Sequence, residues 1–340
     1  AVLETYGELA LGPYAGLSIG QAVQLPTEKL AAALTDLMKE KEVNVTTRKC
    51  GISIPFASSL MSVIELPEVS AKELSTMVPI EARKYIPVPM EEVMLDWSVI
   101  PKSEMQREEP EEAALGAVST LVSAPPLPKI DVLTVAIHKG TIARYQEIAS
   151  QAGLNAGFFE IEIFSTMRSV LDEGLRPVMI MDMGAASTKL YIIERGIIRV
   201  SHTINRGSQD ITSTISKSLG ITPEQAEVMK RSVGAAGNDP KLNELIALVL
   251  DHIFAEVNTT LLSFEKKYNK TVAKAILVGG GASLKGISEL AKNNFKTEAE
   301  MGAPFNKVST PAFLEKILRE TGPEFAVAIG LALRKLAEEE

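Results

Sequence analysis

The chain has 340 residues, 46% of them hydrophobic, and a formal net charge of −8 at pH 7. This length predicts two or three compact units, and the acidic balance argues against a nucleic-acid partner, which selects for basic surfaces. The single cysteine, Cys50, excludes a disulfide framework and indicates a reducing cytosol. No apolar run approaches the roughly 20 residues of a membrane helix, and we predict no signal peptide at the amino end.

The first 101 residues predict an alternation of strands and helices. Alternation around Tyr6 predicts an opening strand, and Thr27 is a candidate cap for a helix whose apolar residues recur at helical spacing. Ser70 is predicted to cap a second helix, which contains Pro79 and ends before Pro87. In chain order, the predicted strands and helices of this part cover residues 1–11, 25–43, 48–56, 59–67, 70–86 and 94–101.

Residues 102–129 have the composition of a long connection, charged at first and proline-rich at its end. Within it, the apolar residues 115–122 predict either a short strand or a short helix. A strand over 130–138, a helix over 139–154 that stops at Gly153, and a helical stretch over 160–174 complete the first half.

The second half predicts three strands joined by tight turns, then helices and one more strand that runs into glycines. Thr222 is predicted to cap a helix that has Pro223 at its first position. The predicted strands cover residues 177–184, 188–194, 197–205 and 272–282, and the predicted helices cover 208–220, 222–234, 240–268, 283–295 and 322–340.

The two halves repeat one pattern, a strand that ends at a glycine turn and feeds a helix. The sequence "GISIP" in the first half also stands where "AILVGG" stands in the second. Such repetition predicts a duplicated α/β unit. On this register, two further strands and a tight turn would open the first half, and they would precede residue 1.

The turn between the first two strands of the second half has the pattern Asp182-x-Gly184-x-x-x-Thr188. Backbone N–H groups on such a turn form a concavity for anions, glycine permits close approach of a phosphate, and an aspartate can hold Mg²⁺ through water. A hairpin turn with an incidental aspartate fits the same pattern.

Two later features fit the nucleoside part of a nucleotide. Helical spacing places Glu227 near Lys230 and Arg231, so that Glu227 can accept from ribose hydroxyls while the basic side chains lie against a base; an exposed, salt-bridged helix face is the alternative. The glycines of 279–281, followed by Ala282, can present flat backbone to a base or phosphate; a flexible turn is the alternative. The three features in this order are more specific than any one of them.

In that order, the features resemble the second half of the actin and heat-shock-chaperone ATPase fold. More closely, nearly the whole chain resembles the PilM family, FtsA-like proteins of type IV pilus assembly. The most specific stretches are "ELSTMVPIEARKYIPVPMEEVMLDWSVI", "MDMGAASTKLYII", "LGITPEQAEVMKRSVG" and "AILVGGGASLKGISEL". The family pattern departs at the start, because the first phosphate turn of the family and its flanking strands would lie before residue 1.

The resemblance implies an α/β, actin-like duplicated fold with an FtsA/PilM-type extra subdomain, the first strands of the first half being absent. The implied parts are a first-half core over 1–68, completed by 152–176 and the last helix, an inserted small α+β subdomain over 69–151, a second-half core over 177–206 and 267–321, a helical subdomain over 207–266, and a carboxy-terminal helix over 322–340.

The resemblance also implies an ATP site. Its expected residues are Asp182, Gly184, Ala185, Ser187, Thr188, Lys189, Glu227, Lys230, Arg231, Gly279, Gly280, Gly281 and Ala282, with Asp182 and Glu162 at Mg²⁺. Glu162 is placed only by position. Because one phosphate turn is found, we expect this chain to bind ATP weakly or not at all. The glycine-rich residues 12–20 contain no aspartate, and we do not expect them to substitute for the other turn.

The implied role is that of a cytoplasmic adaptor, peripheral at the inner membrane, that binds the amino-terminal tail of a PilN-like membrane protein. Pilus assembly ATPase and platform proteins are further implied partners, and a homo-oligomer is possible. We expect an extended tail to lie in a cleft between the first-half core and the extra subdomain. We expect it to meet Glu81, Lys84, Tyr85, Ile86 and Pro87, unless Tyr85 and Ile86 are simply core residues.

Two rival functions remain open. An ATP-hydrolysing enzyme or sugar kinase of the same superfamily would need a second aspartate turn and a general base, neither of which we find, so we expect a scaffold rather than an enzyme. An FtsA-like polymer-forming membrane anchor would need an amphipathic carboxy-terminal helix. The chain ends in "LALRKLAEEE", whose final charges disfavour an anionic membrane surface.

Overall fold

The computed structural model describes residues 1–100, 128–172 and 174–338. They fall into two compact units, a larger one of Ala1–Ser53 with Tyr145–Glu340 and a smaller one of Ile54–Arg144. The predicted subdomain over 69–151 therefore starts and ends later in the sequence than the smaller unit does. The predicted short element over 115–122 lies outside the described residues.

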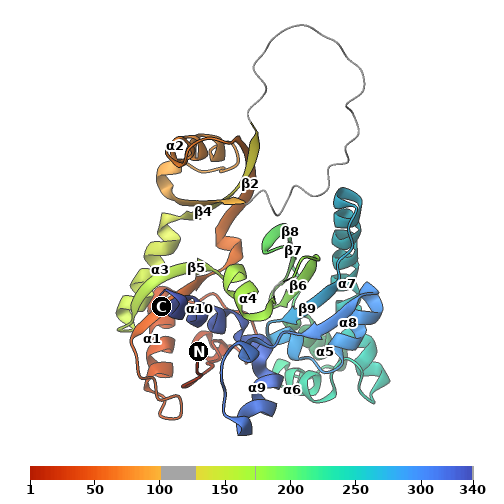
Figure 1. The fold of residues 1–340 in the computed structure, drawn as a ribbon. Coiled ribbons are helices and arrows are strands. Elements are labelled where there is room, and N and C mark those ends of the chain that lie inside the picture. Colours follow the sequence, from red (N-terminus) through yellow and green to blue (C-terminus); the bar gives the residue numbers. More distant parts are fainter. Residues whose placement is uncertain (101–127, 173, 339–340) are drawn as a thin grey trace. The chain divides into compact units, whose positions relative to one another are not determined.

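A five-stranded sheet with the order β10-β9-β6-β7-β8 forms the centre of the larger unit (Figure 1). Strands β6 and β9 run parallel, with Asp182 beside Val278, so the turns that follow them lie at the same edge of the sheet. Strand β7 returns antiparallel to β6 and pairs Lys189 with Asp182. The strands are β6 (Val178–Met183), β7 (Thr188–Glu194), β8 (Ile197–Ile204), β9 (Lys274–Val278) and β10 (Glu298–Met301).

Helices pack against this sheet around one large core cluster, which Leu190, Ile211, Ile246, Leu250 and Leu277 help to form. These helices are α5 (Ser208–Leu219), α6 (Pro223–Val233), α7 (Pro240–Tyr268) and α8 (Ile287–Phe295). The predicted Thr222 cap of α6 is confirmed, since its side chain accepts from the Gln225 amide.

Helix α7 is long and apolar enough to cross a membrane by length and composition, which the sequence reading did not anticipate. Its buried residues include Leu242, Ile246, Val249, Leu250 and Ile253, which recur at the spacing of one helix face. That face belongs to the core cluster, so α7 has the packing of an amphipathic core helix.

The rest of the larger unit contains a two-stranded sheet of β1 (Lys49–Ile54) and β5 (Asn155–Ile161). The helices of this part are α1 (Thr27–Lys39), α4 (Glu162–Val170), α9 (Glu315–Thr321) and α10 (Ala326–Ala337), while α3 (Lys139–Gln151) runs in from the smaller unit. Helices α4 and α10 cross so closely at Gly330 that a Cβ there would lie 1.9 Å from the backbone oxygen of Ser165.

Three local predictions in this unit are wrong, and one strand was not predicted. Residues 1–11 form only an isolated bridge between Val2 and Ser309, because alternation alone supplies no partner strand. Pro26, rather than Thr27, precedes the first residue of α1. Glu160 and Ile161 end strand β5 instead of opening a helix, and strand β10 was missed because its exposed acidic residues mask the strand pattern.

The smaller unit is a three-stranded antiparallel sheet, ordered β2-β4-β3, with helix α2 against one face. The predicted cap of α2 is confirmed, since Ser70 and Glu73 form a reciprocal capping box. Strand β2 pairs with β4 in this sheet, whereas the sequence had placed it in the first-half core. The prediction was wrong because the residue pattern of β2 fits either sheet, and only strand pairing distinguishes them. The elements are β2 (Ser59–Pro67), β3 (Val93–Ile100), β4 (Lys129–His138) and α2 (Ala71–Ala82).

Candidate functional site

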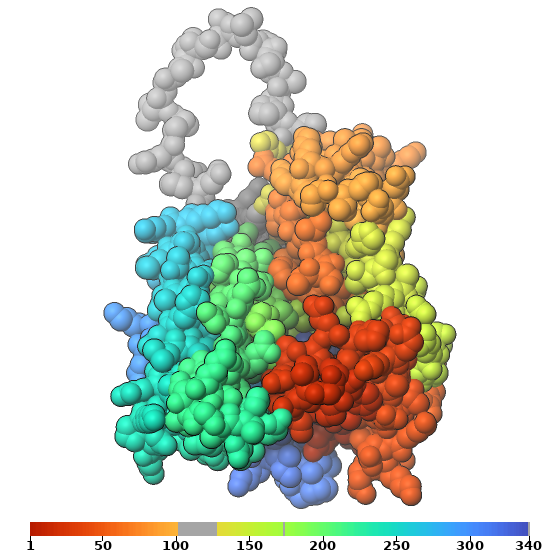
Figure 2. All heavy atoms as spheres, turned by 180° about the vertical axis from the view of Figure 1, so that it is seen from behind, coloured from red at the N-terminus to blue at the C-terminus, as the bar shows by residue number. Residues whose placement is uncertain are grey.

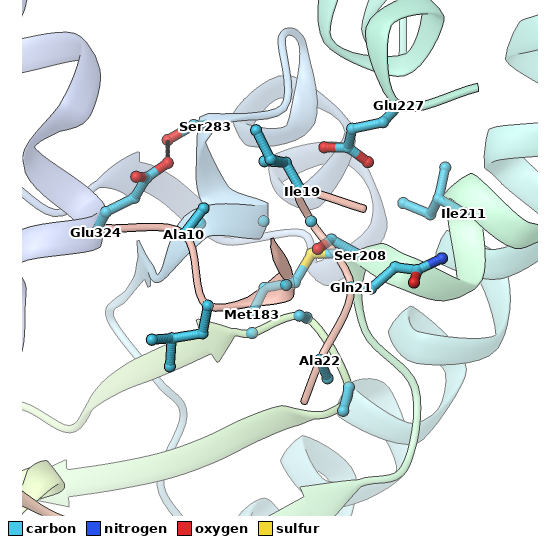
Figure 3. A pocket seen from close by; sticks show the side chains of 18 of the residues that line it. Ala10, Ile19, Gln21, Ala22, Met183, Ser208, Ile211, Glu227, Ser283 and Glu324 are labelled. Carbon is cyan, nitrogen blue, oxygen red and sulfur yellow. Dashed lines mark hydrogen bonds between the residues drawn. The ribbon is translucent and has the colours of Figure 1, made fainter. Parts of the chain in front are cut away.

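A pocket of about 690 Å³ opens in the larger unit, at the edge of the sheet where β6 and β9 end (Figure 3). It brings together the turn after β6, the first turn of α5, helix α6, the glycine turn after β9 and the amino-terminal segment. Its lining residues are 8–12, 19–23, 183–187, Lys189, Ser208, Ile211, Glu227, Lys230, Arg231, Gly280, Gly281, Ser283, Leu284 and Glu324.

The turn after β6 is closed by a 2.9 Å hydrogen bond from the Gly184 amide to the Ser187 oxygen. The first amides of α5 donate to the Gly184 and Ala185 oxygens, each at 3.0 Å. Within residues 1–100, 128–172 and 174–338, the amides at 185–187 have no hydrogen-bond partner. Consecutive unpartnered amides on a turn are donors for an anion.

Gly207 fits α5 closely against this turn, a role that the sequence reading missed. A Cβ there would lie 2.3 Å from the Ala185 oxygen. Only a glycine lets the two backbones approach so closely. A single glycine in a loop before a helix gave no local signal for this contact.

The predicted nucleotide residues divide into a set that lines the pocket and a set that lies behind it. The lining set is Gly184, Ala185, Ser187, Lys189, Glu227, Lys230, Arg231, Gly280 and Gly281. Thr188 is buried, and its hydroxyl donates to the Arg206 oxygen at 2.9 Å. Asp182, Gly279 and Ala282 also stand behind the wall, where a Cβ at Gly279 would meet Asp182 Oδ1 at 2.4 Å.

Asp182 and Glu162 do lie together, but they converge on a lysine. Lys189 Nζ is 2.7 Å from Glu162 Oε1 and 3.8 Å from Asp182 Oδ2. Burial raises the pKa of Asp182 to about 6, although Lys189 opposes this. Burial lowers the pKa of Lys189, but the Asp182 and Glu162 carboxylates raise it by more, so the ammonium stays charged.

The predicted magnesium site therefore does not fit this geometry. In the described part of the chain, no group of three His, Cys, Asp or Glu side chains converges as metal ligands would. The ammonium of Lys189 already pairs with the two carboxylates that were expected to hold the ion. The sequence reading placed Lys189 among the phosphate contacts and did not foresee this ion pairing.

Glu227 lies at the other end of the pocket, and both of its carboxylate oxygens accept hydrogen bonds from neighbouring side chains. It accepts from Thr212 Oγ1 and Lys230 Nζ, both at 2.6 Å, and from Arg231 Nε at 2.7 Å. Burial raises the pKa of Glu227, but the Lys230 and Thr212 hydrogen bonds outweigh it and leave the pKa below its usual value. The open alternative of an exposed helix face is wrong for Glu227 and Lys230, which are both 5% exposed.

Residues 8–23, the amino-terminal wall, close the pocket opposite the β6 turn. The Ala22 amide donates to Gln209 Oε1 of α5 at 3.0 Å, and the Ser18 hydroxyl donates to Glu224 of α6. Figure 2 shows the red atoms of the amino-terminal part against green atoms of the second half. Gly12 and Gly20, from the glycine-rich segment that we did not expect to substitute for the other phosphate turn, line the pocket.

Two glutamates, Glu8 and Glu324, lie near the glycine turn after β9. Ser283 Oγ donates to Glu324 Oε1 at 3.3 Å, and Figure 3 shows the side chains of Ser283 and Glu324 facing each other. Burial and the neighbouring Glu8 carboxylate raise the pKa of Glu324. Both glutamates were missed because they come from segments far apart in sequence, and neither carries a motif.

The segment predicted to meet a partner lies in the smaller unit, and its residues differ in role. Ile86 is buried in a small cluster with Ala82 and Val93. Tyr85 is 54% exposed and Ile80 is 65% exposed, so the core alternative holds for Ile86 and not for Tyr85. Lys84 Nζ pairs with Glu81 at 2.8 Å on the surface beside them.

A family model described as type IV pilus assembly protein PilM matches residues 19–336. The chain belongs to the PilM family. A solved structure described as a PilM–PilN type IV pilus biogenesis complex aligns with a TM-score of 0.75 at 25% identity, over 94% of this chain and 88% of that one. The family and this structural match confirm the predicted α/β, actin-like fold with its extra subdomain.

The chain is also similar to the cell division protein FtsA. The FtsA of Neisseria meningitidis is 23% identical over 343 residues, 90% of this chain and 80% of that protein. The FtsA of Escherichia coli K12 is 22% identical over 234 residues, 60% of this chain and 54% of that protein. The chain thus spans about half the length of the first FtsA relatives that it matches.

Proposed function

We propose that this chain is a scaffold of type IV pilus assembly that binds the amino-terminal tail of a PilN-like membrane protein. The observation that carries the proposal is family membership over 19–336, together with a shared fold over 94% of the chain with a protein solved as a PilM–PilN complex. The scaffold works in the cytoplasm and reaches the inner membrane through this partner.

The smaller unit offers a surface that suits an extended peptide. Strand β3 is an edge strand of its sheet, and an extended tail can add to such an edge through main-chain hydrogen bonds. Ile86 packs with Val93 at the start of β3, which places Tyr85 close to that edge. The exposed side chains of Ile80 and Tyr85 would supply the apolar contacts.

Calorimetric titration with a synthetic PilN-type tail tests this proposal. We expect binding with a Kd below about 100 μM, a generous bound for a peptide-sized interface. Tyr85→Ala should weaken binding several-fold, and Leu248→Ala, which truncates a 65% exposed residue in the larger unit, should leave it unchanged. Failure of the tail to bind near 100 μM contradicts the proposal.

We further propose that the pocket of the larger unit is a weak site for a nucleoside phosphate. The amides at 185–187 belong to residues that line it and have no partners in the described residues, and glycines at 280 and 281 line its far end. Against tight binding, both oxygens of Glu227 are engaged and Glu8 and Glu324 add negative charge. No general base is assigned, and the chain acts as a scaffold rather than an enzyme.

Equilibrium titration with ATP tests this second role. We expect a Kd above about 100 μM, because few backbone donors contribute about 1 kcal/mol each. Ser187→Pro removes one of the donor amides and should weaken binding further, whereas Leu248→Ala should not. A Kd in the low micromolar range would contradict the proposal.

A further inference from the structure

We propose that Lys189 takes the place of a divalent cation at the phosphate turn, so that the pocket receives a phosphate group without bound metal. This inference rests on the proposed phosphate-binding role of the pocket. It starts from the ammonium of Lys189, which lines the pocket and pairs with Glu162 and Asp182.

The position of Lys189 is fixed by elements of regular structure. Lys189 in β7 stands directly opposite Asp182 in β6, so their side chains lie on the same face of the sheet. Glu162 is the first residue of α4, and its carboxylate meets the ammonium from that helix. The lysine side chain is 19% exposed, and this exposed part faces the pocket.

A magnesium ion and this ammonium cannot share the two carboxylates. Mg²⁺ needs oxygen ligands at about 2.0–2.1 Å in near-octahedral geometry, whereas the ammonium already lies 2.7 Å from Glu162 Oε1. A second cation would be repelled at this distance in a partly desolvated site. With Lys189 present the cluster has a net charge of about −1, and without it about −2, which is the charge that attracts a divalent ion.

The same lysine is placed to serve a phosphate. An ammonium carries three donors, and the amides at 185–187 stand nearby in the same wall of the pocket. The positive charge that an actin-like site would otherwise take from a metal is thus supplied by the chain itself. Phosphate binding should then be indifferent to divalent cations.

Thermal unfolding with and without Mg²⁺ tests this substitution independently of any nucleotide. We expect about 10 mM Mg²⁺ to leave the Tm of the wild-type chain unchanged, because Lys189 already occupies the Glu162 and Asp182 carboxylates. Lys189→Met should lower the Tm by several degrees, and Mg²⁺ should recover most of that loss. Lys189→Met combined with Glu162→Gln should lose the recovery.

Two controls keep the outcome interpretable. Lys292→Met removes an exposed lysine paired with Glu298 at 3.0 Å and measures any general effect of Mg²⁺ on a lysine-depleted surface. Lys189→Arg keeps the charge and should behave as the wild type even if Lys189→Met folds poorly. Stabilisation of the wild type by Mg²⁺ beyond that of Lys292→Met, or no recovery of a folded Lys189→Met chain, overturns the proposal.

Binding experiments separate this inference from the pocket's proposed ligand. ATP affinity should be the same in EDTA and in Mg²⁺ for the wild type, and should become stronger with Mg²⁺ for Lys189→Met. Electron paramagnetic resonance should find no Mn²⁺ bound to the wild type; bound Mn²⁺ would overturn the role of Lys189. If ATP fails to bind in every condition while the Tm results hold, the nucleotide proposal fails and the role of Lys189 stands.

Discussion

The two facing walls of the pocket differ in what holds their backbone. The wall of β6, β7 and α5 is built from ladder pairs and from helix amides that donate to the turn. Among the described residues, the backbone hydrogen bonds of the amino-terminal wall are short and local, such as that from Leu17 to Gly12, and side chains hold this wall to α5 and α6. One wall is therefore rigid by its secondary structure, and the other depends on a few long-range polar contacts.

The largest effect on this comparison is expected from Glu227→Gln, at the junction of the two walls. Removing the carboxylate leaves the buried Lys230 ammonium without its counter-charge, with Ser208 O and Thr212 Oγ1 still accepting from it, which costs about 3–5 kcal/mol. Denaturant unfolding should record this loss. A loss below about 1 kcal/mol would mean that the network is not formed in solution.

The loss of stability at acidic pH is a second test of the role of Glu227. Burial raises the pKa of Glu227, but hydrogen bonds from Lys230 and Thr212 hold it below the ordinary value of 4.5. The stabilisation is therefore present above about pH 4.5 and is lost as the pH falls through the folded-state pKa. Glu227→Gln should flatten this part of the wild-type curve, and an unchanged curve would contradict the assignment.

Gly207→Ala should give the next largest effect, in the rigid wall. The new Cβ would lie 2.3 Å from the backbone oxygen of Ala185, which cannot move without breaking the first turn of α5. Overpacking against backbone costs about 1–3 kcal/mol. Gly196→Ala is the control, because a Cβ there meets nothing within 4 Å, although its φ of 77° adds strain.

Gly20→Ala should cost less, although it also creates a close contact. Its Cβ would lie 2.8 Å from Glu227 Cδ at a φ of 86°, but the amino-terminal wall can shift because few backbone bonds restrain it. We expect a loss below about 1 kcal/mol in global stability and faster proteolysis within 8–23. Gly16→Ala, with φ of 72° and open space, is the matched control. A global loss as large as that of Gly207→Ala would remove the distinction between the walls.

The sequence predicted the parts of the pocket outside the amino-terminal wall well, because their signals are local. The Asp182–Thr188 turn, the Thr222 cap and the glycines after β9 each follow from neighbouring residues, and parallel pairing then sets the two turns side by side. Most helices and strands of both units were also predicted from local residue patterns, including α2 with its capping box.

The rest depended on contacts between residues far apart in the chain. Ala22 meets Gln209 and Ser18 meets Glu224 across more than 180 positions, and no local pattern encodes either pair. The strand predicted over 1–11 failed because alternation cannot supply a partner strand. Lys189 was expected at phosphate, yet its pairing with Glu162 needs α4 beside β7, which only the folded chain reveals.

Hydrogen exchange of the full chain, with and without a PilN-type tail, tests the proposed function most directly. We predict that the tail slows amide exchange in residues 80–87 and along β3, while β6 to β8 of the larger unit keep their rates. Slowed exchange confined to the larger unit, or no change with saturating tail, would contradict the proposed scaffold role of the smaller unit.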